Sequence, residues 1–467
     1  MNANPDAQAS KPVIEYVATH ALQPFKQNAR MHPRKQIKQI AESIREFGFT
    51  VPILIGDELN IVAGHGRVLA AKELGLEQVP AIRLSHLTLT QQRAYVLADN
   101  KLAQNSAWDV DILAGEFQAL TDLGIDLDLT GFSSTEIDFA FDAAREKTED
   151  SVGREDALPE MGEVALTAAG DVWRLGPHKL ICGDARDPDV METLLGNERA
   201  DLVFTDPPYN VQIDGNVTGL GKIRHREFAM ASGEMSSDEF TEFLQASLGR
   251  MAAHSRDGAI LYVCMDWRHG RHLQQAAENI GLEFKNLCVW NKTNAGMGSF
   301  YRSKHELVFV FKLGSAPHVN NFGLGESGRH RSNVWDYAGV TIPGRARTEA
   351  LAMHPTVKPV ALVADAIRDC SKRGDIVLDA FGGSGTTLIA ADICGRNARV
   401  IEYDPLYCDT IVRRWERFCG HRAVHVSSGM TYEQLFEERT GAPPPLVPDI
   451  NLIRTRSGNR GRRSQAR

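Results

Sequence analysis

The chain has 467 residues, of which 43% are hydrophobic and 24% charged, and its formal net charge is −8. This composition excludes a collagen-like, a largely disordered or a disulfide-scaffold protein, and the length predicts about two to four domains. The negative charge argues against a surface that binds nucleic acid everywhere, although it is compatible with a local basic face.

Cysteine usage and hydropathy point to a reducing compartment. The seven cysteines are scattered without a Cys-x-x-Cys pair, so we expect neither disulfides nor a metal site. The first residues are polar and lack the apolar run of a secretory signal. Stretches of about 18 apolar residues are absent. We therefore expect a cytoplasmic protein without a membrane partner.

The first part of the chain predicts a small α+β domain at 12–141, preceded by a flexible arm at 1–11. Two short strands (VPILIG and LNIVAG) are expected before the Gly64–Arg67 box and a helix after it. An earlier helix is expected to end at Gly48, because apolar residues recur before it with helical spacing, namely Ile37, Ile40, Ile44 and Phe47.

The rest of the chain divides into a linker, a larger domain and an extension. Residues 142–169 predict an acidic linker, because Asp142 to Glu163 contains eight acidic and three basic residues. Residues 170–424 alternate strand and helix patterns, which predicts a doubly wound α/β sheet with its site at the carboxyl ends of the strands. The expected strands are HKLICGD, ADLVFTD, GAILYVC, KNLCVWN, ELVFVFK, DIVLDAF and ARVIEYD. Residues 425–467 predict a C-terminal extension with a disordered, Arg-rich tail.

Two of these strand ends carry groups suited to chemistry. The strand ending at Asp379 runs into a glycine-rich turn, Phe381 to Thr387, in which backbone can approach a ligand closely. Glu402 ends the next strand, and an acid at this position suits hydrogen bonds to ribose hydroxyls. An ordinary tight turn is the alternative for this pattern alone.

The second strand end is Asp206-Pro207-Pro208-Tyr209, in which two prolines fix the backbone directly after the strand. A carboxylate and the Pro207 carbonyl could both accept N–H bonds from an exocyclic amino group. Tyr209 offers a face on which an extruded base can stack. The pattern therefore predicts methyl transfer to such an amino group, against the alternative of a turn that merely closes the strand.

These two motifs together resemble the amino-group DNA methyltransferases that use S-adenosyl-L-methionine. The catalytic motif precedes the cofactor turn, as in the permuted β group of that family, and the family's other motifs match at Gly183-Asp184 and at His354 to Pro359. The resemblance covers about 171–415. It implies a Rossmann-like methyltransferase fold, and an Asp in the first position of the catalytic motif points to N6 of adenine.

The resemblance also implies roles for single residues. Glu402 would hold the ribose of the cofactor, Asp184 its adenine and Lys358 its carboxylate, although Lys358 could instead be a surface lysine. The methionine part would be surrounded by Asp379, Phe381, Gly383, Ser384, Gly385 and Thr386. Ala380 and Gly382 depart from the family's pattern, and we expect a slightly looser turn. Neither a metal nor a general base is required, because the sulfonium is already a strong methyl donor and the amine can lose its proton late.

Sequence recognition is expected in the segment 314–350, where basic and aromatic residues interleave as in DNA-contacting loops. The expected DNA contacts are Arg329, Arg331, Asn333, Arg345 and Arg347. A solvated charged loop is the alternative. The basic loop 216–226 is expected to close over the flipped base, and the Arg-rich tail to attract phosphates.

The first domain resembles ParB-like (ParB/sulfiredoxin-type) domains, through Pro24 to Arg30, the helix before Gly48 and the Gly64–Arg67 box. In relatives this box binds nucleotide phosphates at a helix N-terminus, so a nucleotide is one expected partner. His65 stands where Glu is more typical, and only one Arg follows. Nucleotide binding, a DNA-tethering or regulatory role and a purely structural role therefore all stay open.

We conclude from the sequence that the chain is a site-specific DNA (adenine-N6) methyltransferase with a ParB-like domain. It would take the methyl group from S-adenosyl-L-methionine and flip the adenine out of double-stranded DNA. N4-cytosine or RNA methylation is an alternative at the same site. A ParB-like partition or regulatory protein with vestigial methylation is a further alternative, which the intact Asp206, Tyr209 and Glu402 disfavour. A homodimer is compatible with all of these.

Overall fold

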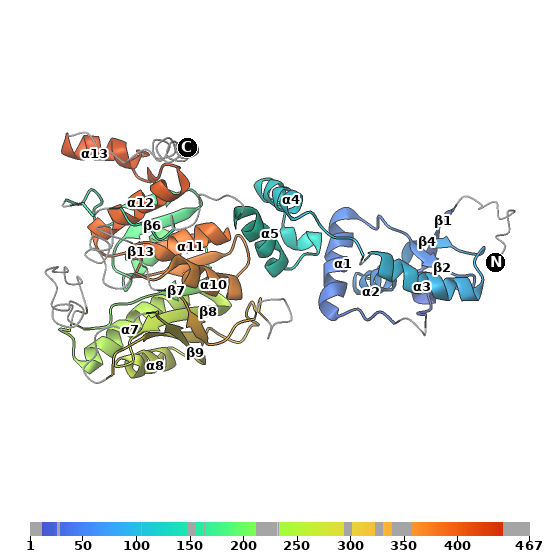
Figure 1. Ribbon diagram of the computed structural model, residues 1–467, viewed down its shortest axis with the longest axis horizontal. Coiled ribbons are helices and arrows are strands. Elements are labelled where there is room, and N and C mark those ends of the chain that lie inside the picture. Colours follow the sequence, from blue (N-terminus) through green and yellow to red (C-terminus); the bar gives the residue numbers. More distant parts are fainter. Residues whose placement is uncertain are drawn as a thin grey trace, which may run out of the picture. The chain divides into compact units, whose positions relative to one another are not determined.

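A computed structural model describes residues 12–25, 29–103, 105–146, 155–159, 161–162, 164–211, 231, 233–293, 301–322, 330–338 and 357–441. The chain divides into two compact units, Met1–Thr148 and Glu149–Arg467 (Figure 1). Within the described residues, none of the helices is long and apolar enough to cross a lipid bilayer.

The first unit contains a four-stranded sheet in the order β1-β4-β2-β3, in which only the β2–β4 pair is parallel. Its elements are β1 (Ile14–Ala18), η1 (Thr19–Ala21), α1 (Arg34–Phe47), β2 (Ile53–Ile55), β3 (Ile61–Ala63), α2 (His65–Glu73), β4 (Gln78–Arg83) and α3 (Leu89–Ala103). Gly48 ends α1 with a left-handed φ of +79°, and its N–H donates to the Ile44 carbonyl. The two expected strands and the helix that ends before Gly48 are thus confirmed.

A separate helical cluster ends the first unit. It consists of α4 (Val110–Asp122), η2 (Leu127–Thr130) and α5 (Ser134–Glu146), and it packs around Phe117 with the ring of Phe132 edge-on at 5.2 Å. The Asp109 carboxylate caps α4 by accepting from two backbone N–H groups. Because α5 continues to Glu146, the helical part extends past residue 141, where the sequence indicated a boundary.

The second unit is built on a ten-stranded sheet in the order β11-β9-β10-β8-β7-β12-β13-β6-β5-β14. The five central strands, from β8 to β6, are parallel, and the β10, β9, β5 and β14 pairings that flank them are antiparallel. The strands are β5 (Val172–Leu175), β6 (His178–Cys182), β7 (Ala200–Thr205), β8 (Ser255–Met265), β9 (Glu283–Asn291), β10 (His305–Lys312), β11 (Val334–Asp336), β12 (Ile376–Asp379), β13 (Asn397–Glu402) and β14 (Val424–His425).

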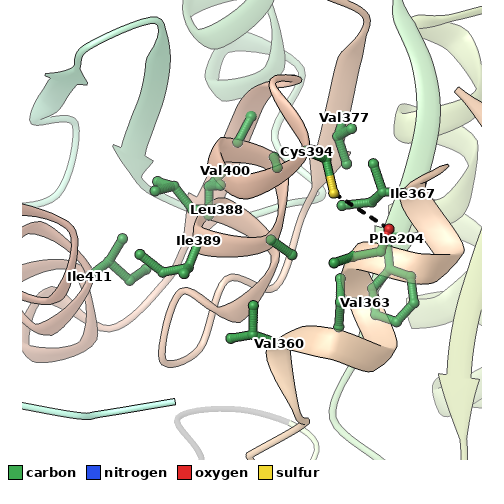
Figure 2. Packing of buried hydrophobic residues seen from close by; sticks show 14 of the residues in the cluster. Phe204, Val360, Val363, Ile367, Val377, Leu388, Ile389, Cys394, Val400 and Ile411 are labelled. Atoms are coloured by element: carbon green, nitrogen blue, oxygen red, sulfur yellow. Dashed lines mark hydrogen bonds between the residues drawn. The ribbon is translucent and has the colours of Figure 1, made fainter. Parts of the chain in front are cut away.

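Helices cover both faces of this sheet. They are α6 (Pro188–Leu195), α7 (Ser237–Ala253), α8 (Gly270–Asn279), α10 (Val360–Cys370), α11 (Thr386–Cys394), α12 (Pro405–Cys419) and α13 (Tyr432–Thr440). Successive residues of β7 point to opposite faces: Phe204 packs in the cluster of α10 and α11 (Figure 2), whereas Val203 packs with α6, α7 and α8. The doubly wound α/β fold is therefore confirmed.

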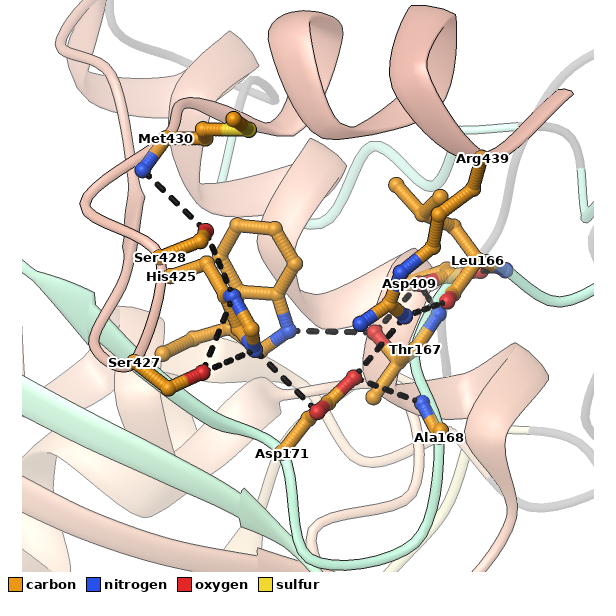
Figure 3. A network of polar contacts seen from close by, with 11 residues as sticks. Leu166, Thr167, Ala168, Asp171, Asp409, His425, Ser427, Ser428, Met430 and Arg439 are labelled. Carbon is orange, nitrogen blue, oxygen red and sulfur yellow. Dashed lines mark hydrogen bonds and ion pairs between the residues drawn. The ribbon is translucent and has the colours of Figure 1, made fainter.

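Chain segments on either side of the predicted larger domain also pack on this unit (Figure 3). Asp171 is paired with His425 at 3.1 Å and with Arg439 of α13 at 3.0 Å. Asp409 of α12 accepts from the N–H groups of Leu166 and Thr167. The folded part of the unit therefore includes residues 164–169, expected in the linker, and residues up to 441, expected in the extension.

Candidate active site

Four acidic residues lie where four neighbouring parallel strands end. The strands β6, β13, β12 and β7 are adjacent and run in the same direction. Asp206 directly follows β7, Asp379 and Glu402 end β12 and β13, and Asp184 follows β6 by two positions. Ligands bind at this edge in doubly wound folds. The four acids that the motifs singled out thus share one edge of the sheet.

Asp206 belongs to a mostly buried ionic cluster at this edge. Its Oδ2 pairs with the ammonium group of Lys358, and its Oδ1 accepts a hydrogen bond from the Tyr209 hydroxyl at 2.6 Å. Glu306 of β10 contacts the same two donors with its Oε1, at 2.7 Å from Lys358 Nζ and 2.9 Å from the Tyr209 oxygen. Lys292 pairs with the Glu306 Oε2 at 2.7 Å. The cluster therefore balances two carboxylates against two ammonium groups.

The burial of Lys358 contradicts the alternative of an exposed lysine, and its role at the cofactor carboxylate stays a prediction. The sequence resemblance placed its ammonium group at the carboxylate of the cofactor, and the alternative was an exposed lysine. In the structure the Lys358 side chain is only 5% exposed, and its ion pairs are with Asp206 and Glu306. Lys358 is thus tied to the catalytic motif. The preceding motif residues, His354 to Thr356, lie outside the described residues.

The pKa values of the two carboxylates move in opposite directions. Burial raises the pKa of Asp206, and the nearby Glu306 carboxylate adds to the rise, while Lys358 opposes it. Burial would raise the pKa of Glu306 as well, but Lys358 and Lys292 outweigh it and bring that pKa to about 2. Glu306 is therefore ionised, and Asp206 is the better proton acceptor of the two.

The loop that carries the catalytic motif is fixed at its far end. Pro207 is buried, Pro208 is half-buried, and Asn210 follows Tyr209 with a φ of +52°. The Asn210 amide donates to the Met235 carbonyl at 2.8 Å, and its oxygen accepts from the Met235 N–H at 3.2 Å. Tyr209 is thus held between the β7 end and a second anchor, which restricts the plane of its ring.

The glycine-rich turn between β12 and α11 is held by two of the acids. Asp379 Oδ1 accepts from the N–H of Phe381 at 3.1 Å and from the Thr205 hydroxyl at 2.9 Å. Glu402 Oε2 accepts from the N–H of Gly383 at 2.6 Å. Gly385 has a left-handed φ of +83° and directly precedes α11. The turn is therefore shaped by contacts to the ends of β7, β12 and β13.

The acids at the turn fit a nucleoside cofactor. Burial raises the pKa of Glu402 to about 7 and that of Asp379 to about 6. The Glu402 oxygens accept N–H bonds from Gly383 and Asp404, and a carboxylate oxygen has two lone pairs. Glu402 can therefore also accept ribose hydroxyls. Asp184 is paired with Arg186 at 2.6 Å, and its role at the adenine stays a prediction.

The packing of the turn contradicts the expectation that it is loose. A Cβ on Gly382 would lie 2.5 Å from Val400 Cγ1, and Ala380 is almost fully buried. Below the turn, the buried Arg414 donates to the Ser384 carbonyl at 2.9 Å and to the Thr386 hydroxyl at 3.2 Å. Gly382 is therefore required by close packing, and Ser384 and Thr386 are supported from the protein interior.

The predicted DNA contacts divide into two groups. Arg329, Arg345 and Arg347 lie outside the described residues, as does the loop 216–226. Arg331 pairs with Asp369 at 2.9 Å and lies over the ring of Trp335, and the Asn333 amide donates to the Leu287 carbonyl. Both residues stabilise the sheet edge around β11. Arg331 is thus not retained among the DNA contacts proposed below.

Three residues of the site were missed from the sequence: Lys292, Glu306 and Arg414. Glu306 is 100 positions from Asp206 in the chain, and the two meet only because β10 pairs with β8 and β8 with β7. The one available signal was an acidic residue at the start of an otherwise apolar strand. Arg414 gave no signal, because charged residues are common in a helix such as α12.

The Gly64–Arg67 box of the first unit borders a cavity of about 190 Å³. Gly64 has a φ of +98° at the start of α2. The cavity is also lined by Arg30, His32, Asp99 and Asn100. The Arg67 guanidinium donates to the carbonyls of Val51 and Pro52, and the His65 ring accepts from the Phe25 N–H. The side chains of His65 and Arg67 are therefore already hydrogen-bonded to backbone groups of the same unit.

Three family models match successive parts of the chain. The ParB N-terminal domain matches residues 3–101, the ParB-methyltransferase HTH domain matches 111–169, and the DNA methylase family matches 200–413. The third match contains both the Asp206–Tyr209 motif and the glycine-rich turn. The chain thus contains a ParB N-terminal domain in its first unit and an N6/N4 DNA methylase domain in its second. The cofactor of this family is S-adenosyl-L-methionine.

Individual relatives cover different parts of the chain. The ParB-like nuclease domain-containing protein YnaK of Escherichia coli (strain K12) is 46% identical over 80 residues, which are 17% of this chain and 92% of YnaK. The Type II methyltransferase M.HinfI of Haemophilus influenzae is 27% identical over 248 residues, 48% of this chain and just under two thirds (66%) of M.HinfI. A crystal structure of the M1.HpyAVI–SAM complex is 22% identical, with a TM-score of 0.38, and covers 50% of this chain and 97% of that one.

Proposed function

We propose that the chain transfers a methyl group to the N6 amino group of adenine at specific sites in double-stranded DNA. The observation that supports this most is the Asp206–Tyr209 pair at the end of β7, with a carboxylate of raised pKa 2.6 Å from a tyrosine hydroxyl. A carboxylate and a neighbouring carbonyl suit an amino group that has two N–H donors. Pro207, directly after Asp206, supplies that carbonyl.

The reaction joins the methyl carbon to N6, breaks the bond from that carbon to the cofactor sulfur and releases one proton from N6. S-Adenosyl-L-methionine supplies the methyl group from its sulfonium. The described residues supply the rest: Asp206 and the Pro207 carbonyl orient the amino group, Asp206 receives the proton, and Tyr209 stacks on the base. Glu402 and Asp379 position the cofactor at the adjacent strand ends.

DNA would approach this edge of the sheet with the target base turned out of the duplex, because the site cannot reach the N6 amino group of a base that is still stacked and paired. Of the predicted contacts, we propose Arg329, Arg345 and Arg347 for the backbone and base edges. Asn333 donates one amide N–H to the Leu287 carbonyl, so its amide oxygen and its second N–H would face the DNA.

The test is transfer of labelled methyl groups from S-adenosyl-L-methionine to unmethylated double-stranded DNA, followed by nucleoside analysis. We expect N6-methyladenine. N4-methylcytosine as the product would replace the adenine proposal, and methylation of RNA alone would replace the DNA substrate. Wild-type protein that binds DNA and cofactor but transfers nothing would favour a regulatory protein.

The matched variant is Asp206→Asn, which keeps the size of the side chain and removes its basicity. We expect kcat to fall by about 10²-fold or more, while the Kd for S-adenosyl-L-methionine stays within about twofold, since Asp206 does not hold the turn. Calorimetry measures that Kd. Loss of cofactor binding in Asp206→Asn would contradict the assigned role.

For the first unit we propose a nucleotide as ligand of the cavity at the Gly64–Arg67 box, supported by the cationic Arg30 and the helix start at Gly64. Because Arg67 is turned towards backbone carbonyls, binding would require it to change partners. Calorimetric titration of the full chain with nucleoside triphosphates tests this.

A further inference from the structure

The ionic cluster around Asp206 presents a conflict with the proposed role of that residue. The carboxylate is expected to accept N–H bonds from the target amino group, yet both of its oxygens are already engaged. Lys358 is paired with Oδ2, and the Tyr209 hydroxyl donates to Oδ1. An ammonium group on a carboxylate also lowers its basicity. Each oxygen keeps a second lone pair, but Asp206 becomes a stronger base and a freer acceptor for the amino group when these two partners move away.

Glu306 lies where it can receive both partners. Its Oε1 is 2.7 Å from Lys358 Nζ and 2.9 Å from the Tyr209 oxygen, so each donor already touches both carboxylates. Each contact can therefore pass from Asp206 to Glu306 by a small rotation of the N–H or O–H bond of the donor. The Tyr209 hydroxyl has a single proton and can donate fully to only one of the two acids at a time.

Lys292 keeps Glu306 suited to this role. Its ammonium group pairs with Glu306 Oε2 at 2.7 Å, whereas Lys358 and Tyr209 both contact the other oxygen, Oε1. Glu306 itself is 7% exposed, so water competes little for its oxygens. With Lys292 in place, Glu306 stays an anion and can hold a second ammonium group without an unpaired buried charge.

We propose that Glu306 is a positioning residue, which takes over the Lys358 ammonium and the Tyr209 hydroxyl when the amino group binds and so frees the Asp206 carboxylate. The proposal rests on the proposed role of Asp206 in methyl transfer. No proton is transferred in this exchange, because Lys358 stays an ammonium ion and Tyr209 keeps its hydroxyl proton. The N–H groups of the base replace the two lost donors at Asp206, and a Tyr209 hydroxyl held by Glu306 fixes the ring for stacking.

The main variant is Glu306→Gln, which keeps the shape and an acceptor oxygen but removes the charge that attracts Lys358. We expect kcat to fall by about tenfold or more, with the Kd for cofactor and for DNA within about twofold of wild type. Lys358 would remain on Asp206 and lower its pKa, so the acidic limb of the pH–kcat profile should move to lower pH. Because removal of the Glu306 charge also lowers the Asp206 pKa by itself, the separate sign of positioning is a fall of kcat that persists at pH values where Asp206 is fully ionised, with both Kd values unchanged.

Two further variants complete the test. Lys292→Gln should give a smaller loss of kcat, because it removes one cation beside Glu306 and leaves the Glu306 carboxylate in place. Since Lys292 is partly exposed, this substitution should disturb folding less than Glu306→Gln does. Glu198→Gln is the matched control: Glu198 pairs with Arg399 at 2.8 Å and Lys179 at 3.1 Å and precedes β7, at the opposite end of the strand from Asp206. It should leave kcat and the pH profile unchanged.

The outcomes separate this proposal from the proposed function. An active wild type together with unchanged kcat and pH profile in both Glu306→Gln and Lys292→Gln would overturn the role of Glu306 and leave methyl transfer intact. An inactive wild type would overturn the methyltransferase proposal itself. If Glu306→Gln does not fold by circular dichroism, the Lys292→Gln profile decides the question.

Discussion

Glu402 is the buried acid through which pH should act on cofactor binding. Its carboxylate accepts from Gly383 and Asp404, and burial brings its pKa to about 7. Ribose hydroxyls donate to a carboxylate, so the ionised form is the one that binds. The raised pKa means that this form is lost as pH falls through about 7. We expect the Kd for S-adenosyl-L-methionine to rise by about fivefold to tenfold between about pH 7.5 and pH 6.

Isothermal titration calorimetry over this pH range measures the effect. Glu402→Gln is the control, because it cannot ionise and should bind the cofactor weakly with little dependence on pH. A wild-type Kd that is constant from about pH 6 to 8 would show that Glu402 does not titrate against the cofactor.

At the level of residues, the sequence could identify groups that sit within motifs and could not identify their long-range partners. Asp206, Asp379 and Glu402 each end a buried strand, and the parallel order of β7, β12 and β13 brings them together. Glu306 reaches Asp206 through an antiparallel strand whose register is set by packing. Neither periodicity nor motif spacing contains that register.

The helices α4 and α5 carry a charge that argues against contact with DNA. They lie within the match to the ParB-methyltransferase HTH domain, yet residues 105–146 contain ten acidic residues and a single base, Arg145. Phosphates would be repelled by such a surface. We therefore expect Glu116→Lys combined with Asp122→Lys on α4 to leave the DNA Kd within about threefold of wild type and its salt dependence unchanged.

Fluorescence anisotropy at several salt concentrations measures this. Arg345→Ala is the comparison, and its slope of log K against log salt should become shallower by about 0.9, the value for one lost phosphate contact. A steeper slope in the double lysine variant would mean that α4 does face the DNA.

At the level of elements, long apolar runs were predicted well and short edge strands were not. The seven expected strands of the second unit are confirmed. Most are buried runs in a sheet covered on both faces, whereas β9 is exposed over its first four residues. The three-residue β11 lies within the segment expected to form DNA-contacting loops, and the two-residue β14 crosses the boundary that was expected between residues 424 and 425. Strands this short contain too few residues to show a period of two.

On the scale of the whole molecule, acidic charge is concentrated between the ParB N-terminal match and the DNA methylase match, mostly within the segment that matches the HTH domain. Residues 105–163 contain sixteen acidic and three basic residues, a net charge of −13, whereas the chain as a whole has −8, so all other residues together carry +5. The negative total therefore describes the connecting segment. It does not describe the surfaces at which a methyltransferase would meet DNA.

Residues 155 and 156, which follow the first unit in the chain, form hydrogen bonds near the glycine-rich turn of the second unit. Asp156 Oδ1 accepts from the N–H of Val360, the first residue of α10, two positions after Lys358. The Glu155 carbonyl accepts from Arg414, which also supports Ser384 in the turn. These contacts belong to the second unit, so that unit contains its own support for the site.

The second unit should therefore methylate DNA on its own. All described residues of the candidate active site and both large apolar clusters lie within residues 149–467. We expect this fragment to fold and to transfer methyl groups with a kcat within about threefold of the full chain. The same labelled-methyl assay, with the Asp206→Asn fragment as blank, measures kcat. A fragment that is folded and binds S-adenosyl-L-methionine but transfers nothing would assign part of the catalytic machinery to the first unit.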